Sequence, residues 1–277
     1  MTNSRPRPIA SLEDVTAEYD AVFCDVWGVV HDGVAKFAAA EEALVRFRAT
    51  GRKVVLVTNS PRRAGSVIDF LDEIGISRKA YDFVATSGDV TRALIASASP
   101  LVFHIGLDAH LALFEGLEIE RVGEERAETI VVTGLAKGDD DTPEAYADLL
   151  QRLAARDLPM ICANPDVTAP KGDRVVWGAG ALARDYAALG GRTRLAGKPF
   201  PAIYDYALRL AGNIDRSAVL AIGDGLATDI KGANDYGLDA LLILAGIDAD
   251  RVGGLDDVAA NLVREKRCAK FVMQQLR

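Results

Sequence analysis

The chain has 277 residues, 49% of them hydrophobic and 26% charged, which is typical of a globular protein large enough to hold two domains. Its formal net charge of −8 argues against a nucleic acid as the main partner, although a locally basic site could still bind a small anion. No apolar run is long enough to span a membrane, which argues against a membrane partner. Three scattered cysteines and the lack of a signal peptide favour a cytoplasmic location, and three histidines without zinc-site spacing argue against a zinc centre.

The first hundred residues alternate apolar strands with helical patterns, and polar residues follow the strands. The apolar run before Asp25 predicts a buried parallel strand with this carboxylate at its carboxyl end, after which Gly28 turns the chain. The next strand is followed by Thr58-Asn59-Ser60-Pro61, and we expect Pro61 to open a helix. Strands are predicted at 21–24, 53–57 and 83–85, and helices at 37–50, 61–71 and 89–98.

The same alternation continues between residues 99 and 193, which we interpret as a second α/β unit inserted into the first. The predicted domains are a core of residues 1–98 and 194–277 and an inserted cap of residues 99–193. We expect Gly178 and Gly180 to lie in a loop rather than in a dinucleotide-binding turn. Strands are predicted at 101–105, 129–132, 160–163 and 175–177, and helices at 108–115, 142–155 and 181–189.

The last part of the chain returns to buried strands. A strongly apolar run ends in Gly223-Asp224-Gly225, and Thr228 is placed to cap a helix that starts at Asp229. Strands are predicted at 218–222 and 239–244, helices at 201–210 and 229–236, and a helical tail from 255 to about 275.

Polar groups that suit phosphoryl transfer follow four separate strand or loop ends. An aspartate such as Asp25 that attacks a phosphate faces charge repulsion, so a divalent cation is needed between them. Mg²⁺ takes oxygen ligands and keeps several waters, so Asp25 and Asp224 could bind it, and Asp229 could bind it directly or orient a metal-bound water. Lys198 could offset the charge of the phosphate and of Asp25. Taken singly, each residue has a plainer explanation as a turn, a helix cap or a surface charge, and only their conjunction favours a site.

These motifs resemble those of phosphatases of the haloacid dehalogenase superfamily. The resemblance spans about residues 18–246 and is to the class IIA group, whose large α/β cap of the C2 type lies between the second and third motifs. It implies an α/β fold with a Rossmann-like core, a parallel sheet covered by helices on both faces, and an inserted α/β cap domain. The matching segments are Asp25-Val26-Trp27-Gly28 in part, Val55 to Ser60, Gly197-Lys198-Pro199, Gly223-Asp224 with Thr228 to Ala233, and the cap phrase Asn164-Pro165-Asp166.

The resemblance implies a Mg²⁺-dependent phosphatase that hydrolyses a small phosphorylated metabolite through an aspartyl-phosphate on Asp25. It implies that Asp25, the backbone carbonyl of Trp27, Asp224 and Asp229 hold the metal. It also allows a homodimer, because members with such caps often pair through them. The implied phosphate-binding residues are Thr58, Asn59, Ser60 and Lys198, with Asp25, Lys198 and Thr58 as the catalytic set and Asn164, Asp166 and Gly180 as substrate contacts from the cap.

Trp27 departs from the family pattern, which has a second aspartate at this position. That aspartate protonates the leaving oxygen, and losing such a general acid costs about 10²- to 10⁴-fold in rate. The loss should be largest for alkoxide leaving groups such as sugars, unless His31 or Asp32 in the same loop substitutes. An alternative function is therefore an impaired member that binds a phosphorylated ligand as a sensor or scaffold. Hydrolytic dehalogenation is a third reading, but the retained metal-site carboxylates argue against it.

Overall fold

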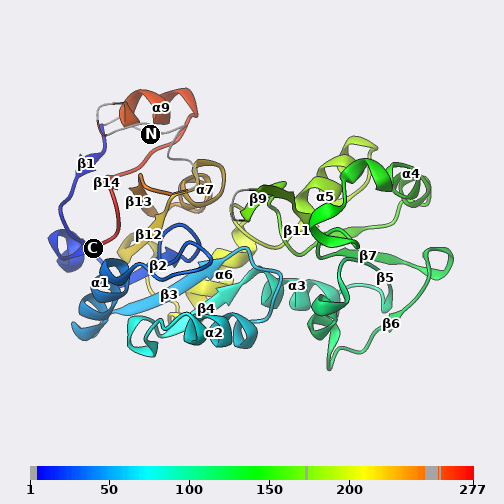
Figure 1. The fold of residues 1–277 in the computed structure, drawn as a ribbon, viewed down its shortest axis with the longest axis horizontal. Coiled ribbons are helices and arrows are strands. Elements are labelled where there is room, and N and C mark those ends of the chain that lie inside the picture. Colours follow the sequence, from blue (N-terminus) through cyan, green and yellow to red (C-terminus); the bar gives the residue numbers. More distant parts are fainter. Residues whose placement is uncertain (1–4, 172–173, 247–254, 256) are drawn as a thin grey trace. The chain divides into compact units, whose positions relative to one another are not determined.

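The computed structural model describes residues 5–171, 174–246, 255 and 257–277, and its contacts divide the chain into two compact units. Unit 1 consists of Met1–Thr58, Val67–Ala85 and Lys198–Arg277, and unit 2 of Asn59–Ser66 and Thr86–Gly197. Unit 2 takes in more of the chain than the predicted insertion, because helix α3 (Ser87–Ala96) packs on strand β8 (Met160–Cys162) of that unit. Figure 1 shows the strands and helices of each unit.

Unit 1 is built on a seven-stranded sheet whose pairs from β1 to β3 are parallel, and the predicted α/β fold class is confirmed. At its centre β12 lies beside β2, with Ile222 opposite Cys24. Both strands are buried along their whole length, as expected for a parallel sheet with both faces covered. The order is β1 (Arg7–Pro8), β14 (Phe271–Met273), β13 (Asp239–Ile243), β12 (Val219–Gly223), β2 (Ala21–Asp25), β3 (Lys53–Thr58) and β4 (Phe83–Thr86).

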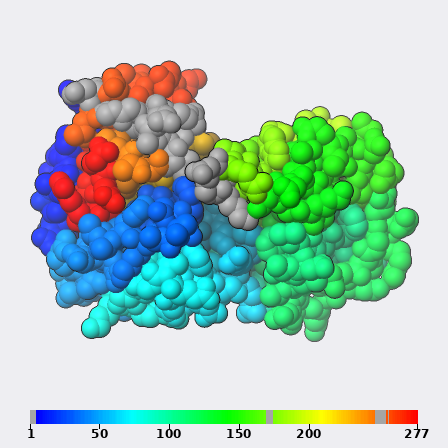
Figure 2. All heavy atoms as spheres, viewed as in Figure 1, coloured from blue at the N-terminus to red at the C-terminus, as the bar shows by residue number. Residues whose placement is uncertain are grey.

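Helices cover both faces of this sheet. Helix α1 packs with the short helices η1 and η2, α6 packs with α7, and both α1 and α6 contact β3. In Figure 2 the blue segment that contains α1 lies on the outer surface of unit 1. The helices are α1 (Ala38–Ala49), α2 (Ala64–Glu73), α6 (Pro201–Leu210), α7 (Lys231–Tyr236) and α9 (Val258–Arg264), with 3-10 turns η1 (Leu12–Glu18), η2 (Arg78–Ala80) and η7 (Arg216–Ala218).

The helical tail predicted for residues 255 to 275 is wrong. Among the described residues of this segment only α9 (Val258–Arg264) is helical, and Phe271–Met273 form strand β14. This strand lies between β13 and β1 and all three of its residues are buried, so its apolar run belongs to the sheet. Residue 256 of the predicted tail lies outside the described part of the chain.

Unit 2 contains a second parallel sheet, of five strands, and a separate antiparallel hairpin. The sheet order is β11 (Thr193–Leu195), β8 (Met160–Cys162), β7 (Thr129–Val132), β5 (Leu101–Ile105) and β6 (Glu120–Arg121), and the hairpin pairs β9 (Thr168–Lys171) with β10 (Arg174–Trp177). Its helices are α3 (Ser87–Ala96), α4 (Ala147–Ala155) and α5 (Ala179–Ala188), with 3-10 turns η3 (Asp108–Phe114), η4 (Glu124–Arg126), η5 (Gly138–Asp140) and η6 (Pro143–Tyr146).

The core of unit 2 follows the alternation of side chains along β7. Ile130 and Val132 pack in the cluster formed with α4 and α5, whereas Val131 packs with Ile95 of α3 and Phe114 of η3. Both faces of the strand are therefore buried, which explains why its sequence is continuously apolar.

Three strands of unit 2 were not predicted, because their sequences lack the pattern of a buried strand. Strands β6 and β11 have only two and three residues and contain charged side chains, so neither shows a buried-strand pattern. Strand β9 lies in the turn-rich stretch after Asp166 and is stabilised by its pairing with β10. In the described part of the chain, no helix has the length and apolar character that a membrane span requires.

A half-buried histidine in unit 2 should make stability depend on pH. His104 Nε2 and His110 Nδ1 lie 2.8 and 3.1 Å from the hydroxyl of Thr133, and burial, followed by His110, lowers the pKa of His104 to about 4. The unfolded chain takes up this proton near pH 6.5, so unfolding is increasingly favoured as pH falls from about 6.5 towards 4. We expect His104→Gln to reduce the difference between melting temperatures at pH 7 and pH 4.5. An unchanged difference would contradict the assignment.

Candidate active site

Three aspartates of unit 1 meet at the carboxyl ends of two neighbouring strands. Asp25 ends β2, and Asp224 directly follows β12, which pairs with β2 in parallel. Asp229 lies one turn further along the chain, and one carboxylate oxygen of each aspartate lies within 4.8 Å of the others. The three residues are 8%, 1% and 5% exposed. Buried carboxylates at this spacing need positive charge nearby.

Lys198 supplies one positive charge to this cluster. Its Nζ lies 2.5 Å from Asp25 Oδ1 and 2.7 Å from Asp229 Oδ1, and the residue is 4% exposed. The lysine precedes α6 and is separated from Asp25 by 173 positions in the sequence. The structure therefore brings together Asp25, Asp224, Asp229 and Lys198, the four charged residues expected to form the phosphoryl-transfer site.

The cluster carries more negative than positive charge. Burial, and then the neighbouring Asp229, raise the pKa of Asp25 well above its usual value, although Lys198 opposes this shift. Burial alone would lower the pKa of Lys198, but the carboxylates of Asp229 and Asp25 outweigh burial and raise it. One ammonium group cannot balance three carboxylates, so the site favours a further cation.

Two glycines make room for the carboxylate of Asp224. A Cβ at Gly28 or at Gly246 would overlap Asp224 Oδ2. Gly28 also has a φ of +84°, which disfavours any other residue. The turn at Gly28 was expected from the sequence, but the approach of Gly246 was not. No sequence signal marks Gly246, because it lies after β13 whereas its partner Asp224 follows β12.

Asp229 is held by a π-helical turn, η8 (Leu226–Ile230), that precedes α7. The Gly225 N–H and the Thr228 hydroxyl donate hydrogen bonds to Asp229 Oδ2 at 3.1 and 3.3 Å. The π turn therefore begins before Asp229 and the α-helix only at Lys231, so the prediction that Thr228 caps a helix starting at Asp229 is wrong. Such single π turns are frequent at functional sites.

Thr58 ends β3, in the register where Val57 lies opposite Asp25. The helix predicted to start at Pro61 starts at Ala64 instead. The reason is tertiary, because the Ala64 N–H donates to Asp89 Oδ2 at 3.0 Å. Asn59 and Ser60 therefore belong to an extended loop, and the Ser60 carbonyl accepts the Gly88 N–H at 3.1 Å.

His31 and Asp32 hold the loop that follows the first motif. His31 Nδ1 accepts the Gly33 N–H at 2.8 Å, and burial lowers the pKa of His31. Asp32 Oδ1 accepts the N–H groups of Ala35 and Val34 at 2.7 and 2.9 Å, and these bonds lower the pKa of Asp32. Both shifts disfavour the protonated forms of these side chains, which argues against both as replacements for the missing acid.

Trp27 is half-buried, and its indole packs over Gly33. A Cβ at Gly33 would lie only 3.1 Å from Trp27 Nε1, so a larger residue would crowd the indole. The φ of +93° at Gly33 also favours glycine at this position. The indole can donate one hydrogen bond, but it cannot transfer a proton as a carboxylic acid does.

The predicted cap residues lie together in unit 2. Asn59 Nδ2 donates to Asp166 Oδ1 at 2.9 Å, and Asn164 Oδ1 accepts the Asp166 N–H at 2.9 Å. Gly180 lies inside α5 and is buried, and a Cβ there would overlap the carbonyl of Pro165. The loop position expected for Gly180 is therefore wrong, whereas Gly178 does lie outside the helix, directly before α5. Contact of Asn164, Asp166 and Gly180 with substrate stays a prediction.

Comparison with protein families gives two matches. A model described as haloacid dehalogenase-like hydrolase matches residues 22–120. A second, described as HAD-hydrolase-like, matches residues 195–270. Together the two matches contain Asp25, Thr58, Lys198, Asp224 and Asp229.

Two curated relatives are phosphatases by name. The chain is 30% identical over 243 residues to a D-glycerol 3-phosphate phosphatase of Mycobacterium tuberculosis, and the match covers 86% of this chain but only 66% of that relative. It is 30% identical over 236 residues to an acid sugar phosphatase of Staphylococcus aureus, with 83% of this chain and 88% of the relative covered.

Two solved structures extend the comparison. A haloacid dehalogenase-like hydrolase from Brucella suis is 46% identical with a TM-score of 0.88, and the match covers 97% of this chain and 100% of that one. A glycerol phosphate phosphatase from Mycobacterium tuberculosis, solved in complex with magnesium, is 28% identical with a TM-score of 0.68 and coverages of 87% and 74%. With the motifs and the fold already described, these matches show that the chain belongs to the haloacid dehalogenase-like hydrolases.

Proposed function

We propose that this protein is a Mg²⁺-dependent phosphatase that hydrolyses a small phosphorylated metabolite, with Asp25 as nucleophile and unit 2 as the cap that selects the substrate. The observation that carries the proposal is the buried contact of Lys198 with both Asp25 and Asp229, beside Asp224. The relatives named as glycerol-phosphate and sugar phosphatases support the same class of substrate.

The donor set fits magnesium. All three acidic side chains offer hard oxygen ligands, and their excess negative charge matches a divalent cation. Asp25, Asp224, Asp229 and the backbone carbonyl of Trp27 would hold it. When bound, the metal would offset the charge of the phosphate and of the attacking carboxylate.

The hydrogen bonds of Asp25 select its attacking oxygen. Asp25 Oδ1 accepts hydrogen bonds from Lys198 Nζ at 2.5 Å and from the Val26 N–H at 2.7 Å, which leaves Oδ2 to attack phosphorus. The new bond joins Oδ2 to phosphorus while the ester oxygen departs. Water then cleaves the aspartyl-phosphate, releases phosphate and restores Asp25. Lys198 and Thr58 would hold the phosphoryl oxygens, with Asn59 and Ser60 following Thr58 in the same loop.

The proposal is tested by turnover of aryl, acyl and sugar phosphates with and without Mg²⁺. Aryl and acyl phosphates need little protonation of the leaving group, so they should turn over fastest in a protein that lacks the family's acid at Trp27. Activity should require the metal and disappear with a chelator. The proposal fails if none of the three substrate classes is hydrolysed.

The second candidate function is a phosphate-ester binding protein without useful turnover. Trp27 favours it, because the indole replaces the carboxylate that would protonate the leaving group. This candidate predicts saturable binding of a phosphate ester in the presence of Mg²⁺ and no hydrolysis of any class.

The close approach of Gly246 to Asp224 gives a separate prediction for the metal. Gly246→Ala should displace the Asp224 carboxylate and weaken Mg²⁺ affinity by about 10- to 100-fold, as changes beside a metal ligand commonly do. The measurement is the dependence of melting temperature on Mg²⁺ concentration. Gly65→Ala is the matched control, because a Cβ at Gly65 meets nothing within 4 Å. Equal Mg²⁺ affinity in both variants would contradict the assignment of Asp224 as a metal ligand.

A further inference from the structure

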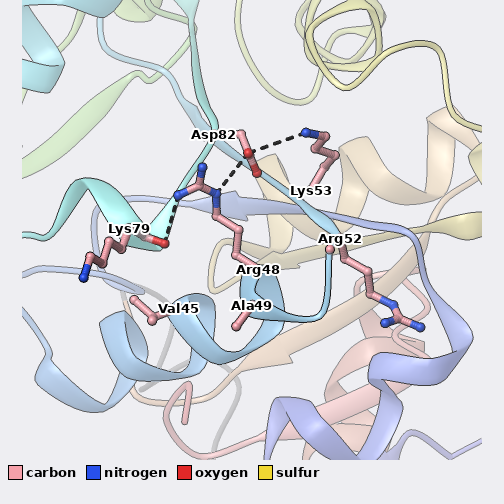
Figure 3. A pocket seen from close by; sticks show the side chains of 8 residues that line it. Val45, Arg48, Ala49, Arg52, Lys53, Lys79 and Asp82 are labelled. Carbon is pink, nitrogen blue, oxygen red and sulfur yellow. Dashed lines mark hydrogen bonds and ion pairs between the residues drawn. The ribbon is translucent and has the colours of Figure 1, made fainter.

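Unit 1 contains a basic cavity of about 330 Å³ at the end of the sheet opposite the aspartate cluster. Figure 3 shows Arg48 at its centre, between Asp82 and the carbonyl of Lys79. Lys53 starts β3 whereas Thr58 ends it, so about 16 Å of strand separates the cavity from the proposed active site. The cavity is lined by Val45, Arg48, Ala49, Gly51, Arg52, Lys53, Lys79 and Asp82.

The lining has a large excess of positive charge in a chain whose net charge is −8. Four lining residues are cationic and one is anionic. Asp82 pairs with Arg48 at 2.9 Å and with Lys53 at 3.7 Å, so both of its neighbours share one negative charge. Within the part of the chain that the structure describes, Arg52 and Lys79 make no ion pair. The cavity is therefore suited to an anion with more than one negative charge.

Contacts with the backbone hold two of these cations in place. Arg48 Nη1 donates to the carbonyls of Arg78 and Lys79 at 3.2 and 3.1 Å. Arg52 Nε donates to the carbonyl of Tyr19 at 2.7 Å, and its Nη1 donates to Thr50 Oγ1 at 2.9 Å. Both guanidinium groups are therefore positioned before any ligand arrives, which lowers the entropy cost of binding.

The helix dipole explains only part of the cluster. Cations near the last turn of a helix stabilise it, and Arg48 lies in the last turn of α1. Lys53 belongs to β3 and Lys79 to η2, however, so different elements contribute charge to the same cavity. A volume of about 330 Å³ is at the lower end of ordinary small-molecule sites.

We propose that this cavity is a second ligand site, distinct from the Asp25 cluster, and that it binds a small multianionic ligand with two phosphate groups. Arg48, Arg52, Lys53 and Lys79 all line the cavity, and guanidinium groups bind phosphate oxygens in a fixed geometry. The ligand is either free pyrophosphate or a metabolite with two phosphates. This inference does not depend on the proposed phosphatase activity.

The test is calorimetric titration of the full chain with pyrophosphate in EDTA at constant ionic strength. Without a divalent cation the three carboxylates of the other site repel anions, so binding there is suppressed. Lys79→Gln should weaken pyrophosphate binding about tenfold, the usual cost of one charged hydrogen bond. Arg209→Gln removes the same charge from an exposed position on α6 and should leave binding unchanged.

Parallel titrations distinguish the sources of the ligand. Orthophosphate should bind more weakly than pyrophosphate, and a hexose bisphosphate that binds more tightly than pyrophosphate would identify an organic ligand. The proposal is overturned if pyrophosphate does not bind, or if Lys79→Gln binds it as the unmodified chain does. It is also overturned if Arg209→Gln weakens binding equally, because the effect would then reflect net charge alone. Lys53→Gln provides a second variant should Lys79→Gln fold poorly.

Discussion

Asp25→Asn should lower phosphate-ester turnover by at least about 10⁴-fold, as expected when the nucleophile of a covalent mechanism is lost. Asparagine has the same shape, but its amide cannot form the bond to phosphorus that Asp25 Oδ2 is proposed to make. The metal-free melting temperature should not fall, because burial and Asp229 already disfavour the charged form of Asp25. Steady-state turnover of an aryl phosphate in Mg²⁺, with thermal denaturation in EDTA, measures both effects.

Asp32→Asn is the matched control. Asp32 lies in the same loop and accepts hydrogen bonds from Val34 and Ala35, and an asparagine oxygen can accept the same bonds. We expect this variant to keep its activity. Hydrolysis by Asp25→Asn at the rate of the unmodified chain would show that Asp25 is not the nucleophile, whichever substrate is used.

Trp27→Asp should raise turnover of sugar phosphates by about 10²- to 10⁴-fold. The family pattern has an aspartate at this position, and its acid would protonate the departing alkoxide. Aryl phosphates should gain much less, because a phenolate leaves without a proton. The measurement is the ratio of kcat/KM for a sugar phosphate to that for an aryl phosphate, in the unmodified chain and in the variant.

Trp27→Asn controls for the size of the side chain. Asparagine removes the indole as aspartate does but supplies no acid, so it should leave the ratio of the two substrates unchanged. If both variants gain equally, the indole hinders the substrate sterically and the account of a missing acid is wrong. If neither gains, another group already protonates the leaving oxygen.

The local sequence was sufficient to predict most strands and the type of fold. Strands such as β2 and β12 are continuous apolar runs ended by a carboxylate or a glycine, and this pattern arises from burial on both faces of a parallel sheet. The short motifs around Asp25, Lys198 and Asp224 indicated the family, which the comparisons confirm. Short strands such as β6 and the strand β14 were missed, because their pairing depends on distant neighbours.

The sequence by itself determined which residues are chemically suited to a phosphoryl-transfer site, because residue type and motif spacing are local properties. Only the tertiary structure decided how they meet. Lys198 reaches Asp25 across 173 positions, and Gly246, in the segment after β13, leaves room for Asp224. The start of α2 was likewise decided by Asp89, which accepts the Ala64 N–H. Such contacts depend on how parallel strands are ordered in the sheet, and local patterns do not encode that order.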